Sequence, residues 1–440
     1  MNFLIETYGC QMNKAESAAI ERILLEHGWR ETQEVSEADL VLLNTCVVRA
    51  TAENRAWARI SQLCALKKQR SFVLCITGCL AENQKFDIKK MAPGVDFVLG
   101  NFQKTSFEAL VTSIENGRES LVVDETPVYQ FSKQHSERGA FQAYIPISHG
   151  CDNFCTYCIV PYVRGRETAR APSEILAELD YCIAHNVREI TLLGQNVNSY
   201  FWKNEGDSLD FADLLALVSK HCADSPIKRI RFLTSHPKDL SQKTIDVMRA
   251  NESIAKHLHL CVQHGSNAIL KAMNRKYTRE QYLDLVKRLR TAMPDITLST
   301  DILVGFPGET EQDIDDTLAL MDQVQFVYSF MYYYNPRKGT PAATMPDQIP
   351  LAKKKLRLER VIQTQKVHTK QIMQKLLGKR LAVLVLSISK KKNNELLASS
   401  EQDIMVCFEG DAELIGSYCL VDITGISGNT FKGRFVQKME

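Results

Sequence analysis

The sequence predicts an α/β protein in three parts: an N-terminal three-layer α/β domain, a partial (βα)6 barrel of the TIM type, and a small C-terminal antiparallel β-barrel. Short apolar runs alternate with helix-like stretches through residues 1–372, and this alternation is typical of parallel sheets joined by helical crossovers. From residue 376 to residue 440 the apolar runs are separated only by turns, as in a small barrel. A chain of 440 residues is also too long to fold around one ordinary hydrophobic core, so several domains are expected.

Residues 1–117 are predicted to form the N-terminal domain. Its strands are expected at the apolar runs NFLIETY, ADLVLLNT, SFVLCIT and VDFVLG, with helices between them at residues 14–27, 50–68 and 82–91. Residues 118–139 are polar and rich in turn-forming residues, so we expect a linker there.

Residues 140–372 are predicted to form the partial barrel, and residues 376–440 the small β-barrel. The six strands of the partial barrel are expected at AYIPIS, EITLLG, IRFLTS, HLHLCV, ITLSTDILVGF and FVYSFMYYY, with helices at residues such as 172–185 and 278–292. The C-terminal strands are expected at LAVLVLSI, DIMVCFEG, YCLVDITGI and TFKGRFV. In a TIM-type barrel the chemistry occurs at the C-terminal ends of the strands.

Composition narrows the class of protein. Hydrophobic residues make up 45% of the chain and charged residues 24%, as in soluble globular proteins. The chain lacks the run of about eighteen apolar residues that a membrane span needs, and its first residues, MNFLIETYG, do not resemble a signal peptide. We therefore expect a cytoplasmic protein with no membrane partner.

Residues 351–392 contain thirteen Lys or Arg against the single acid Glu359, which indicates either an anionic partner or a solvated helix face.

The sharpest signal is the motif GCDNFCTYC after the first strand of the partial barrel. Cys151, Cys155 and Cys158, here called the loop trio, have the spacing C-x3-C-x2-C, so their thiolates can converge on one metal centre. Three ligands leave one iron of a four-iron cluster open for a substrate. A structural zinc site would need a second pair of cysteines at C-x2-C spacing, and this pair is missing.

A second set of cysteines, here called the N-terminal trio, consists of Cys10 in TYGCQMN, Cys46 in LNTCVVR and Cys79 in ITGCLAE. Each directly follows one of the first three predicted strands, so all three are expected at the same edge of a parallel sheet. Cys75 lies within a strand and Cys64 in a helix, which makes them poorer candidates. For any one cysteine alone, burial in the core is the commoner role, but three equivalent strand ends predict a second cluster site.

The loop trio, placed after the first barrel strand, resembles the radical S-adenosylmethionine (SAM) superfamily. This resemblance implies that SAM chelates the open iron of a [4Fe-4S] cluster and is cleaved after one-electron reduction to a 5′-deoxyadenosyl radical. The radical would then remove a hydrogen atom from an unreactive carbon. In such an enzyme the cofactor performs the difficult step, while the protein orients it and excludes water.

The N-terminal trio, the loop trio and the C-terminal barrel together resemble the methylthiotransferases over almost the whole chain. The family implies a second [4Fe-4S] cluster that holds the sulfur, two SAM molecules per turnover, an electron donor of the flavodoxin or ferredoxin type, and a sulfur source. The motifs TYGCQMN, GCDNFCTYCIVPYVRGRE, RFLTSHPKD, MNRKYTRE and STDILVGFPGET look like the MiaB type. That type implies tRNA carrying N6-isopentenyladenosine beside the anticodon as substrate, with the methylthio group added to C2.

Further candidate residues lie near the predicted strand ends. Gln195 and Asn196 in LLGQNVN are candidates to hydrogen-bond SAM or the adenine, although these residue types are also common in turns. Asp301 is an acid in an apolar strand, so it is either paired or functional, and it is the third candidate for SAM or substrate. Ser235 and His236 are candidates to contact the RNA substrate, and a structural histidine is the alternative.

Contacts to RNA are also expected from arginines. Arg164 and Arg166 in YVRGRE follow the loop trio, and Arg can bind phosphate in bidentate fashion or stack on a base. The run KKKLRLER at residues 353–360 is an alternative that would track the RNA backbone. Selection of the base is expected to require extrusion of the adenosine into the barrel mouth.

The chain departs from the family pattern in two places. Where the family usually has the sequence LPVQSGS near the fourth barrel strand, this chain has LCVQHGS, with Cys261 and His264 substituted. The C-terminal barrel resembles the RNA-binding TRAM domain, but Ala398, Ser399 and Ser400 lie where the family has a Gly-Arg-Thr patch. The second departure predicts a weaker grip on RNA.

Three other functions stay open from sequence. A methylthiotransferase could act instead on a ribosomal protein or on threonylcarbamoyl-adenosine. A non-catalytic iron-sulfur carrier would use both trios without cleaving SAM. A pure RNA-binding protein would leave six placed cysteines without a purpose.

Overall fold

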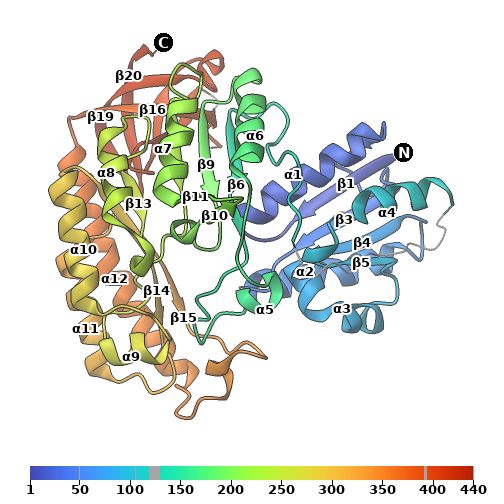
Figure 1. Cartoon of the computed structure of the whole chain (residues 1–440), viewed down its shortest axis with the longest axis horizontal. Coiled ribbons are helices and arrows are strands. Elements are labelled where there is room, and N and C mark those ends of the chain that lie inside the picture. Colours follow the sequence, from blue (N-terminus) through green and yellow to red (C-terminus); the bar gives the residue numbers. More distant parts are fainter. Residues whose placement is uncertain (49, 105, 118–128, 391–393, 440) are drawn as a thin grey trace. The chain divides into compact units, whose positions relative to one another are not determined.

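The computed structural model describes the chain except residues 49, 105, 118–128, 391–393 and 440, and the side chains at 85 and 86. The described residues form two compact units. Unit 1 consists of Met1–Phe154 and Cys158–Ser208, and unit 2 of Cys155–Tyr157 and Leu209–Glu440. Figure 1 labels many of the helices and strands. Among the described residues, every helix is too short or too polar to cross a bilayer.

Unit 1 begins with a parallel sheet of order β2-β1-β3-β4-β5. The strands are β1 (Asn2–Thr7), β2 (Arg30–Glu31), β3 (Leu40–Thr45), β4 (Val73–Gly78) and β5 (Phe97–Leu99). The helices around them are α1 (Gln11–Glu26), α2 (Ala50–Leu66), α3 (Cys79–Met91), η1 (Asn101–Gln103) and α4 (Ser106–Glu115). The four predicted strands are all present. The additional strand β2 has two exposed residues, so no apolar pattern marked it in the sequence.

Alternation of side chains along β3 and β4 produces two separate cores in this sheet. Leu40 and Leu42 point to one face, where they pack with residues of α1 and α4. Val41 and Leu43 point to the other face, where they pack with residues of α2 and α3. All six residues of each of these strands are buried, because helices cover both faces. The predicted three-layer arrangement is therefore present.

The rest of unit 1 contains the first part of the predicted partial barrel. Strands β6 (Gln142–Pro146) and β9 (Glu189–Leu193) pair in parallel, and α6 (Pro172–Ala184) connects them. The shorter elements are β7 (Ser148–His149), α5 (Val160–Arg164), β8 (Thr168–Ala169), η2 (Val197–Ser199) and β10 (Phe201–Asn204). Strand β11 (Asp207–Asp210) follows at the boundary between the units.

The described part of the predicted linker packs within unit 1. Tyr129 stacks on His149 with ring centroids 3.4 Å apart, and the buried His135 contacts Glu178. Residues 118–128 of that linker lie outside the described part of the chain. The two compact units therefore divide the chain differently from the predicted domain boundaries, since unit 1 spans both the first predicted domain and the start of the second.

Unit 2 contains the remaining barrel strands and the C-terminal barrel. The strands are β12 (Arg229–Phe232), β13 (His257–His259), β14 (Thr297–Val304) and β15 (Tyr328–Tyr333), and β13-β14-β15 form a parallel sheet. The helical elements are α7 (Phe211–His221), η3 (Pro237–Asp239), α8 (Gln242–Ala250), α9 (Asn267–Ala272), α10 (Arg279–Ala292), α11 (Glu311–Val324), η4 (Pro341–Thr344) and α12 (Leu351–Leu376). Thr278 and Thr310 start α10 and α11 with capping boxes, which satisfy backbone N–H groups at the helix ends.

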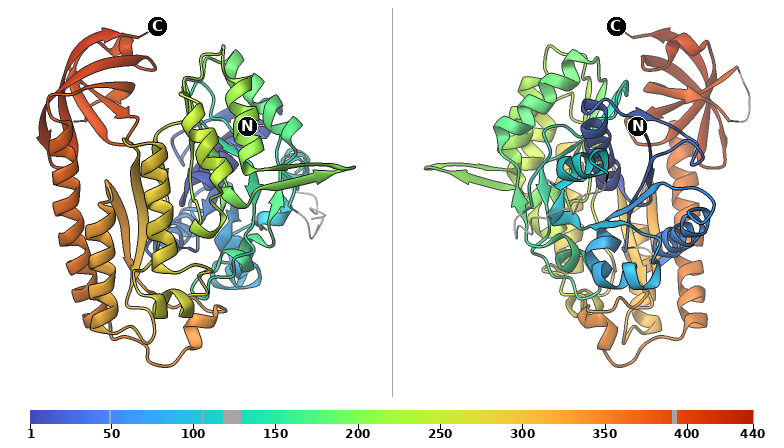
Figure 2. Two further views of the ribbon diagram at one scale, coloured as in Figure 1. Left: turned by 60° about the vertical axis from the view of Figure 1, so that its left-hand side comes forward. Right: turned by 90° about the vertical axis from the view of Figure 1, so that its right-hand side faces the viewer.

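The C-terminal barrel is closed, with strand order β16-β17-β18-β20-β19. Its elements are β16 (Arg380–Ile388), β17 (Glu395–Ser400), β18 (Met405–Glu409), η5 (Ala412–Leu414), β19 (Tyr418–Ser427) and β20 (Thr430–Lys438). Four strand pairs are antiparallel as predicted, but β18 and β20 pair in parallel because β20 closes the barrel between β18 and β19. Figure 2 shows α12 leading to this barrel. Arg229 and Arg231 of β12 donate to carbonyls of Ser399 and Ser400, which ties the barrel to the rest of unit 2.

Candidate metal centres

The N-terminal trio lies at one edge of the first sheet. Cys10 precedes the first residue of α1, Cys46 follows the last residue of β3, and Cys79 begins α3 directly after β4. The three strands before these cysteines are parallel neighbours, so their C-terminal ends meet at the same edge. The structure thus places all three cysteines where the sequence predicted them.

Two glycines make this close approach possible. A Cβ atom at Gly9 would lie 3.1 Å from the Cβ of Cys46 and 2.8 Å from the side chain of Asn13. Gly78 has a φ of +91°, and a Cβ there would lie 2.4 Å from the carbonyl oxygen of Thr45. Only glycine fits both the space and the positive φ at this second position. Gly9 and Gly78, next to Cys10 and Cys79, therefore allow the strand ends to pack closely.

Polar side chains surround the sulfur atoms of the N-terminal trio. The Asn101 amide lies 3.8 Å from Cys79 Sγ and donates to the Val163 carbonyl at 2.7 Å. Asn13 Oδ1 lies 3.2 Å from Cys10 Sγ and 3.5 Å from Nη2 of Arg164. Asn13 Oδ1 is an acceptor, whereas the Asn101 amide is a donor toward sulfur, and such donors are typical of iron-sulfur sites, where they orient the ligands and tune the potential.

A buried group of charges lies beside this trio. Arg164 Nη1 donates to Glu16 Oε1 at 2.9 Å, and Lys104 forms a second ion pair with Glu16. Burial alone would raise the pKa of Glu16, but Arg164 and Lys104 outweigh it and hold that pKa well below its usual value. Burial lowers the pKa of Lys104 to about 8, although Glu16 opposes this shift.

Arg164, Lys104 and Glu16 together carry a net charge of one positive unit. Arg164 also interacts electrostatically with Cys79 and Cys10. Cysteine ligands bind iron as thiolates, so an excess of positive charge nearby suits them. The donor set of the N-terminal trio therefore fits an iron-sulfur cluster.

Arg164 was predicted to contact RNA, and its position does not agree with this. The side chain is only 3% exposed and is occupied by Glu16, so it is not available to a phosphate. Arg166 is different: its side chain is 74% exposed, it lies over the ring of Phe154 at 4.6 Å, and it pairs weakly with Asp152. Of the two arginines, Arg166 alone has a surface position.

In unit 1 the loop trio begins with a constrained turn. Gly150 has a φ of +81°, and a Cβ there would lie 2.1 Å from the Arg166 carbonyl, so only glycine fits. Gln195 accepts a hydrogen bond from the Gly150 amide at 2.6 Å, and Cys151 N donates to the Gly165 carbonyl at 3.1 Å. The predicted cofactor residue Gln195 therefore positions the backbone beside Cys151.

In unit 2, Cys155 is held by a residue that the sequence analysis did not single out. Arg275 Nη1 lies 3.4 Å from Cys155 Sγ, and its Nη2 donates to the Cys261 carbonyl at 2.8 Å. Arg275 belongs to the motif MNRKYTRE, which was identified in the sequence. Its contact with Cys155, 120 residues away in the chain, was not predicted. A guanidinium donor beside the sulfur again suits a thiolate that binds iron.

The remaining predicted residues are mostly buried. Asn196 is 2% exposed and starts the 3-10 turn η2, where its carbonyl accepts from Ser199. In the same turn the buried amide of Asn198 has no hydrogen-bond partner among the described residues, and no sequence pattern marks this residue. An unpaired buried amide is costly, so Asn198 is a further candidate to bind SAM.

Ser235 and His236 lie in unit 2 at the end of β12. The Ser235 amide donates to the His259 carbonyl, and its buried hydroxyl lacks a hydrogen-bond partner within the described chain. His236 packs edge-on against Tyr277. Burial and the charge of Arg275 lower the pKa of His236 to about 2, so the imidazole is neutral. Asp301 lies 3.5 Å from His259 and 3.4 Å from Cys261 Sγ.

Much of the basic run in α12 is used for internal contacts. Lys354 donates to the Tyr334 carbonyl at 2.9 Å, and Arg357 pairs with Glu309 at 2.9 Å and with Glu311 at 2.7 Å. These side chains therefore hold α12 in unit 2 and are not available to an RNA backbone.

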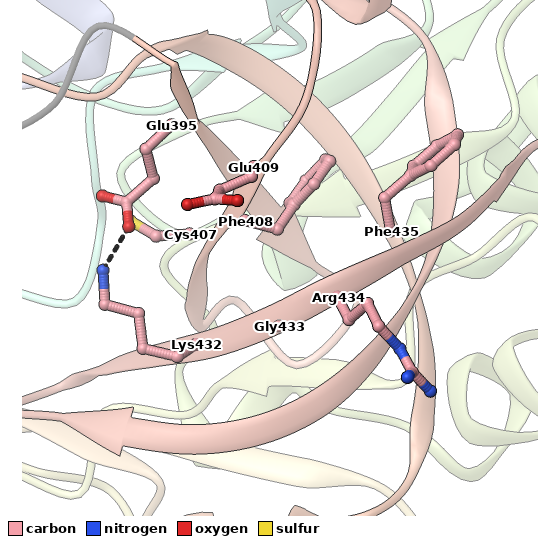
Figure 3. A pocket seen from close by; sticks show the side chains of 8 residues that line it. All are labelled: Glu395, Cys407, Phe408, Glu409, Lys432, Gly433, Arg434 and Phe435. Carbon is pink, nitrogen blue, oxygen red and sulfur yellow. Dashed lines mark hydrogen bonds and ion pairs between the residues drawn. The ribbon is translucent and has the colours of Figure 1, made fainter.

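The C-terminal barrel carries a surface hollow of mixed charge (Figure 3). Lys432 pairs with Glu395 at 2.5 Å, and Phe435 stacks against Phe408 with centroids 6.2 Å apart. Ala398, Ser399 and Ser400, which replace the expected patch, are buried. These positions therefore offer no charged side chain to RNA.

Residues 145–321 match the Radical SAM superfamily, and residues 2–100 match the family described as "Uncharacterized protein family UPF0004". Together with the loop trio and the fold, this defines a radical SAM enzyme, and the superfamily implies a [4Fe-4S] cluster and SAM.

Similarity to curated relatives extends over nearly the whole chain. The tRNA-2-methylthio-N(6)-dimethylallyladenosine synthase of Treponema denticola is 45% identical, covering 98% of this chain and 99% of that one. The enzyme of the same name from Treponema pallidum is 44% identical, with 100% and 99% covered, and that from Acetivibrio thermocellus is 42% identical, with 99% and 91% covered. This chain belongs to the family of tRNA-2-methylthio-N(6)-dimethylallyladenosine synthases, as its sequence motifs predicted.

Solved structures agree with the predicted fold class. The radical SAM methyltransferase TsrM from Kitasatospora setae aligns with a TM-score of 0.59 at 14% identity, covering 78% of this chain and 74% of that one. The cobalamin-dependent radical SAM enzyme OxsB aligns with a TM-score of 0.53 at 12% identity, covering 82% and 56%. At this identity the likeness concerns the fold alone.

Proposed function

We propose that this chain transfers a methylthio group to C2 of N6-isopentenyladenosine, also called dimethylallyladenosine, in tRNA. The observation that carries the proposal is the N-terminal trio at one sheet edge, beside an excess of buried positive charge. A radical SAM enzyme needs one cluster for SAM cleavage, so a second cluster-binding trio indicates a second task. The names of the full-length relatives favour this tRNA nucleoside over a ribosomal protein or threonylcarbamoyl-adenosine.

The two trios would hold two [4Fe-4S] clusters with separate roles. When bound, these groups and two SAM molecules supply the 5′-deoxyadenosyl radical, the sulfur and the methyl group. Arg275 donates a hydrogen bond to Cys155 Sγ, and Gln195 accepts one from the Gly150 amide in the turn before Cys151. Asn101 donates toward Cys79, while Arg164 supplies charge that stabilises thiolates.

Other side chains in this proposal bind SAM or substrate. Gln195, which accepts from the Gly150 amide, and its neighbour Asn196 would bind SAM or the adenine through their amide groups. Asp301 is the third such residue. Ser235 and His236 would contact the substrate in unit 2, where the neutral imidazole can donate or accept a hydrogen bond.

The proposal also involves external partners. An electron donor of the flavodoxin or ferredoxin type would reduce the cluster of the loop trio, and a separate source would replace the transferred sulfur. Exposed Arg166 would contact the RNA, because its guanidinium is available to phosphate or to a base. A tRNA substrate implies a cytoplasmic enzyme.

The test is anaerobic incubation of the cluster-reconstituted protein with SAM, a strong reductant and tRNA containing isopentenyladenosine, followed by mass spectrometry of the nucleosides. Methylthio-isopentenyladenosine is the expected product. The matched control is the same tRNA lacking the isopentenyl group, which should stay unmodified.

Two other results would change the proposal in different ways. SAM cleavage without this product would keep the radical chemistry and move the substrate to threonylcarbamoyl-adenosine or a ribosomal protein. Absence of SAM cleavage in a protein that carries both clusters would favour an iron-sulfur carrier.

A further inference from the structure

Unit 2 contains a cluster of ligand-type side chains that belongs to neither trio. His259 ends β13, Cys261 follows two residues later, and Asp301 lies on the neighbouring strand β14. One ligand atom from each residue lies within 4.8 Å of the other two. Side chains two residues apart on an extended chain point to the same side, which is why His259 and Cys261 converge.

The distances within this cluster fit a tetrahedral metal site. His259 Nε2 lies 3.5 Å from Asp301 Oδ2, and Cys261 Sγ lies 3.4 Å from the same oxygen. Zinc bonds of roughly 2.0 Å to nitrogen or oxygen and 2.3 Å to sulfur place the ligands of a tetrahedron about 3.3–3.6 Å apart. The distances of 3.5 Å and 3.4 Å within the cluster both lie in this range.

The histidine is oriented for metal binding through its second nitrogen. His259 Nδ1 lies 3.0 Å from Ser299 Oγ, which leaves Nε2 directed toward Asp301. Ser299 Oγ also lies 3.0 Å from His257 Nε2, whose Nδ1 in turn lies 2.9 Å from Thr297 Oγ1. Metal-binding histidines are commonly fixed in this way by a hydrogen bond at the nitrogen that does not bind the metal.

The backbone that carries Cys261 is equally fixed. Its carbonyl accepts from Arg275 at 2.8 Å and from the Tyr277 hydroxyl at 3.2 Å, and its amide donates to the Ser235 carbonyl at 3.1 Å. These contacts hold the sulfur in place before any ion arrives, and such preorganisation is what a metal site needs.

The charge of this cluster and its exposure to solvent also suit a divalent metal ion. A thiolate, a carboxylate and a neutral imidazole carry two negative charges, which a divalent cation compensates. His259 and Cys261 are buried, whereas the Asp301 side chain is 29% exposed and offers a path for the ion. A soft thiolate combined with imidazole selects zinc over magnesium or calcium.

We propose that His259, Cys261 and Asp301 bind one zinc ion in unit 2, with a fourth position open to water or to a nitrogen or oxygen donor of a bound molecule. Three protein ligands with an open position are typical of zinc sites that bind a substrate. Arg275 donates to both Cys155 Sγ and the Cys261 carbonyl, so a ligand of this zinc would lie near Cys155, which also belongs to unit 2. Asp301 would then contact a bound molecule indirectly, through the zinc ion. The proposal goes beyond the proposed function and does not depend on it.

The test uses the holoenzyme with both clusters loaded, so that the six cluster cysteines are occupied by iron. The protein is incubated with zinc chloride and desalted, and its metal content is measured. We expect about one zinc per chain in the wild type and at least about tenfold weaker retention in Cys261→Ser and His259→Gln. Cys64→Ser, which removes a cysteine of α2, is the matched control and should retain zinc. Iron content and circular dichroism check that each variant is folded.

X-ray absorption at the zinc edge decides the ligand set in the wild type itself. One sulfur at about 2.3 Å and nitrogen or oxygen ligands at about 2.0 Å are expected. Three or more sulfurs would place the zinc in an incompletely loaded cysteine trio and overturn the proposal. Zinc retention in the wild type no greater than in Cys261→Ser would also overturn it.

Discussion

The N-terminal trio comes from three separate strand ends of one parallel sheet, whereas the loop trio lies within residues 151–158 of a single segment. The first depends on the fold of a whole domain, on glycines that allow strand ends to meet, and on a buried group of charges. The second depends on a local turn and on single contacts, such as that of Arg275 with Cys155. We therefore expect the two sites to fail independently when a residue that supports only one of them is changed.

The largest expected effect comes from the cysteines themselves. Replacement of any one of the six by Ala should abolish methylthiolation of tRNA. Cys155→Ala should also abolish SAM cleavage, whereas Cys46→Ala should keep it, and each variant should lose about half of the bound iron. The measurements are iron content, 5′-deoxyadenosine by chromatography and nucleoside mass spectrometry. Full methylthiolation by Cys46→Ala would show that the N-terminal trio is wrongly assigned.

Arg164→Gln should have the next largest effect, on the stability of unit 1. The change leaves Glu16 paired with Lys104 but removes the buried hydrogen bonds of Arg164 to this carboxylate, and a hydrogen bond to a charged group contributes about 1.5–3 kcal/mol. Chemical unfolding measures this loss, with Arg166→Gln as the exposed control that should change stability little. Equal effects of both substitutions would contradict the role of burial.

The same charges predict a pH dependence of stability. Arg164 and Lys104 hold the pKa of Glu16 below the value of 4.5 that is usual for a glutamate. A carboxyl whose pKa is lower in the folded state stabilises the protein fully above the unfolded pKa, and this contribution is lost as the pH falls. Wild type should therefore lose more stability than Glu16→Gln between neutral pH and about pH 3. Parallel pH profiles of the two proteins would contradict this.

Glycine substitutions separate the two sites at a smaller cost. Gly78→Ala forces a Cβ to 2.4 Å from the Thr45 carbonyl and should reduce iron in the N-terminal trio while SAM cleavage continues. The strain of a positive φ costs about 1–3 kcal/mol. Gly28→Ala is the matched control, since Gly28 has a φ of +77° but no atom within 4 Å of such a Cβ.

The corresponding change at the loop trio is Gly150→Ala, where the Cβ would lie 2.1 Å from the Arg166 carbonyl. It should reduce SAM cleavage and leave the iron of the N-terminal trio in place. If each glycine variant lost both clusters, the two sites would not be independent.

Arg275→Met should have the smallest of these effects. It removes the donor beside Cys155 Sγ, so SAM cleavage should slow about tenfold and the potential of that cluster should become more negative. Electron paramagnetic resonance during a redox titration measures the potential. Arg249→Met, at an exposed position, is the control. An unchanged potential would show that Arg275 has only a structural role.

Much of the fold was predictable because its signals are local. Apolar runs marked the first sheet and the six barrel strands, and the strand-end rule placed the N-terminal trio. Strands β2 and β17 and the parallel pairing of β18 with β20 were missed. The two residues of β2 are exposed, β17 has the sequence ELLASS with few large apolar residues, and barrel closure depends on distant strands. Arginine is usually exposed, so the sequence did not indicate that Arg164 is buried against Glu16.

The candidate sites divide in the same way. Spacing and strand ends singled out the candidate cysteines, but the contacts around these cysteines join residues far apart in the chain, as Arg275 and Cys155 do. The unpaired amide of Asn198 could not be predicted either, since pairing depends on the surrounding structure. Sequence reasoning therefore identified the candidate metal ligands and missed most of the residues that contact them in the structure.

The most direct test of the account is to express this chain in a bacterial host that lacks its own methylthiotransferase and to analyse the host tRNA nucleosides by mass spectrometry. Wild type should convert isopentenyladenosine to its methylthio derivative, while Cys46→Ala and Cys155→Ala should leave it unconverted. Unmodified isopentenyladenosine in cells that contain folded, cluster-loaded wild type would contradict the account.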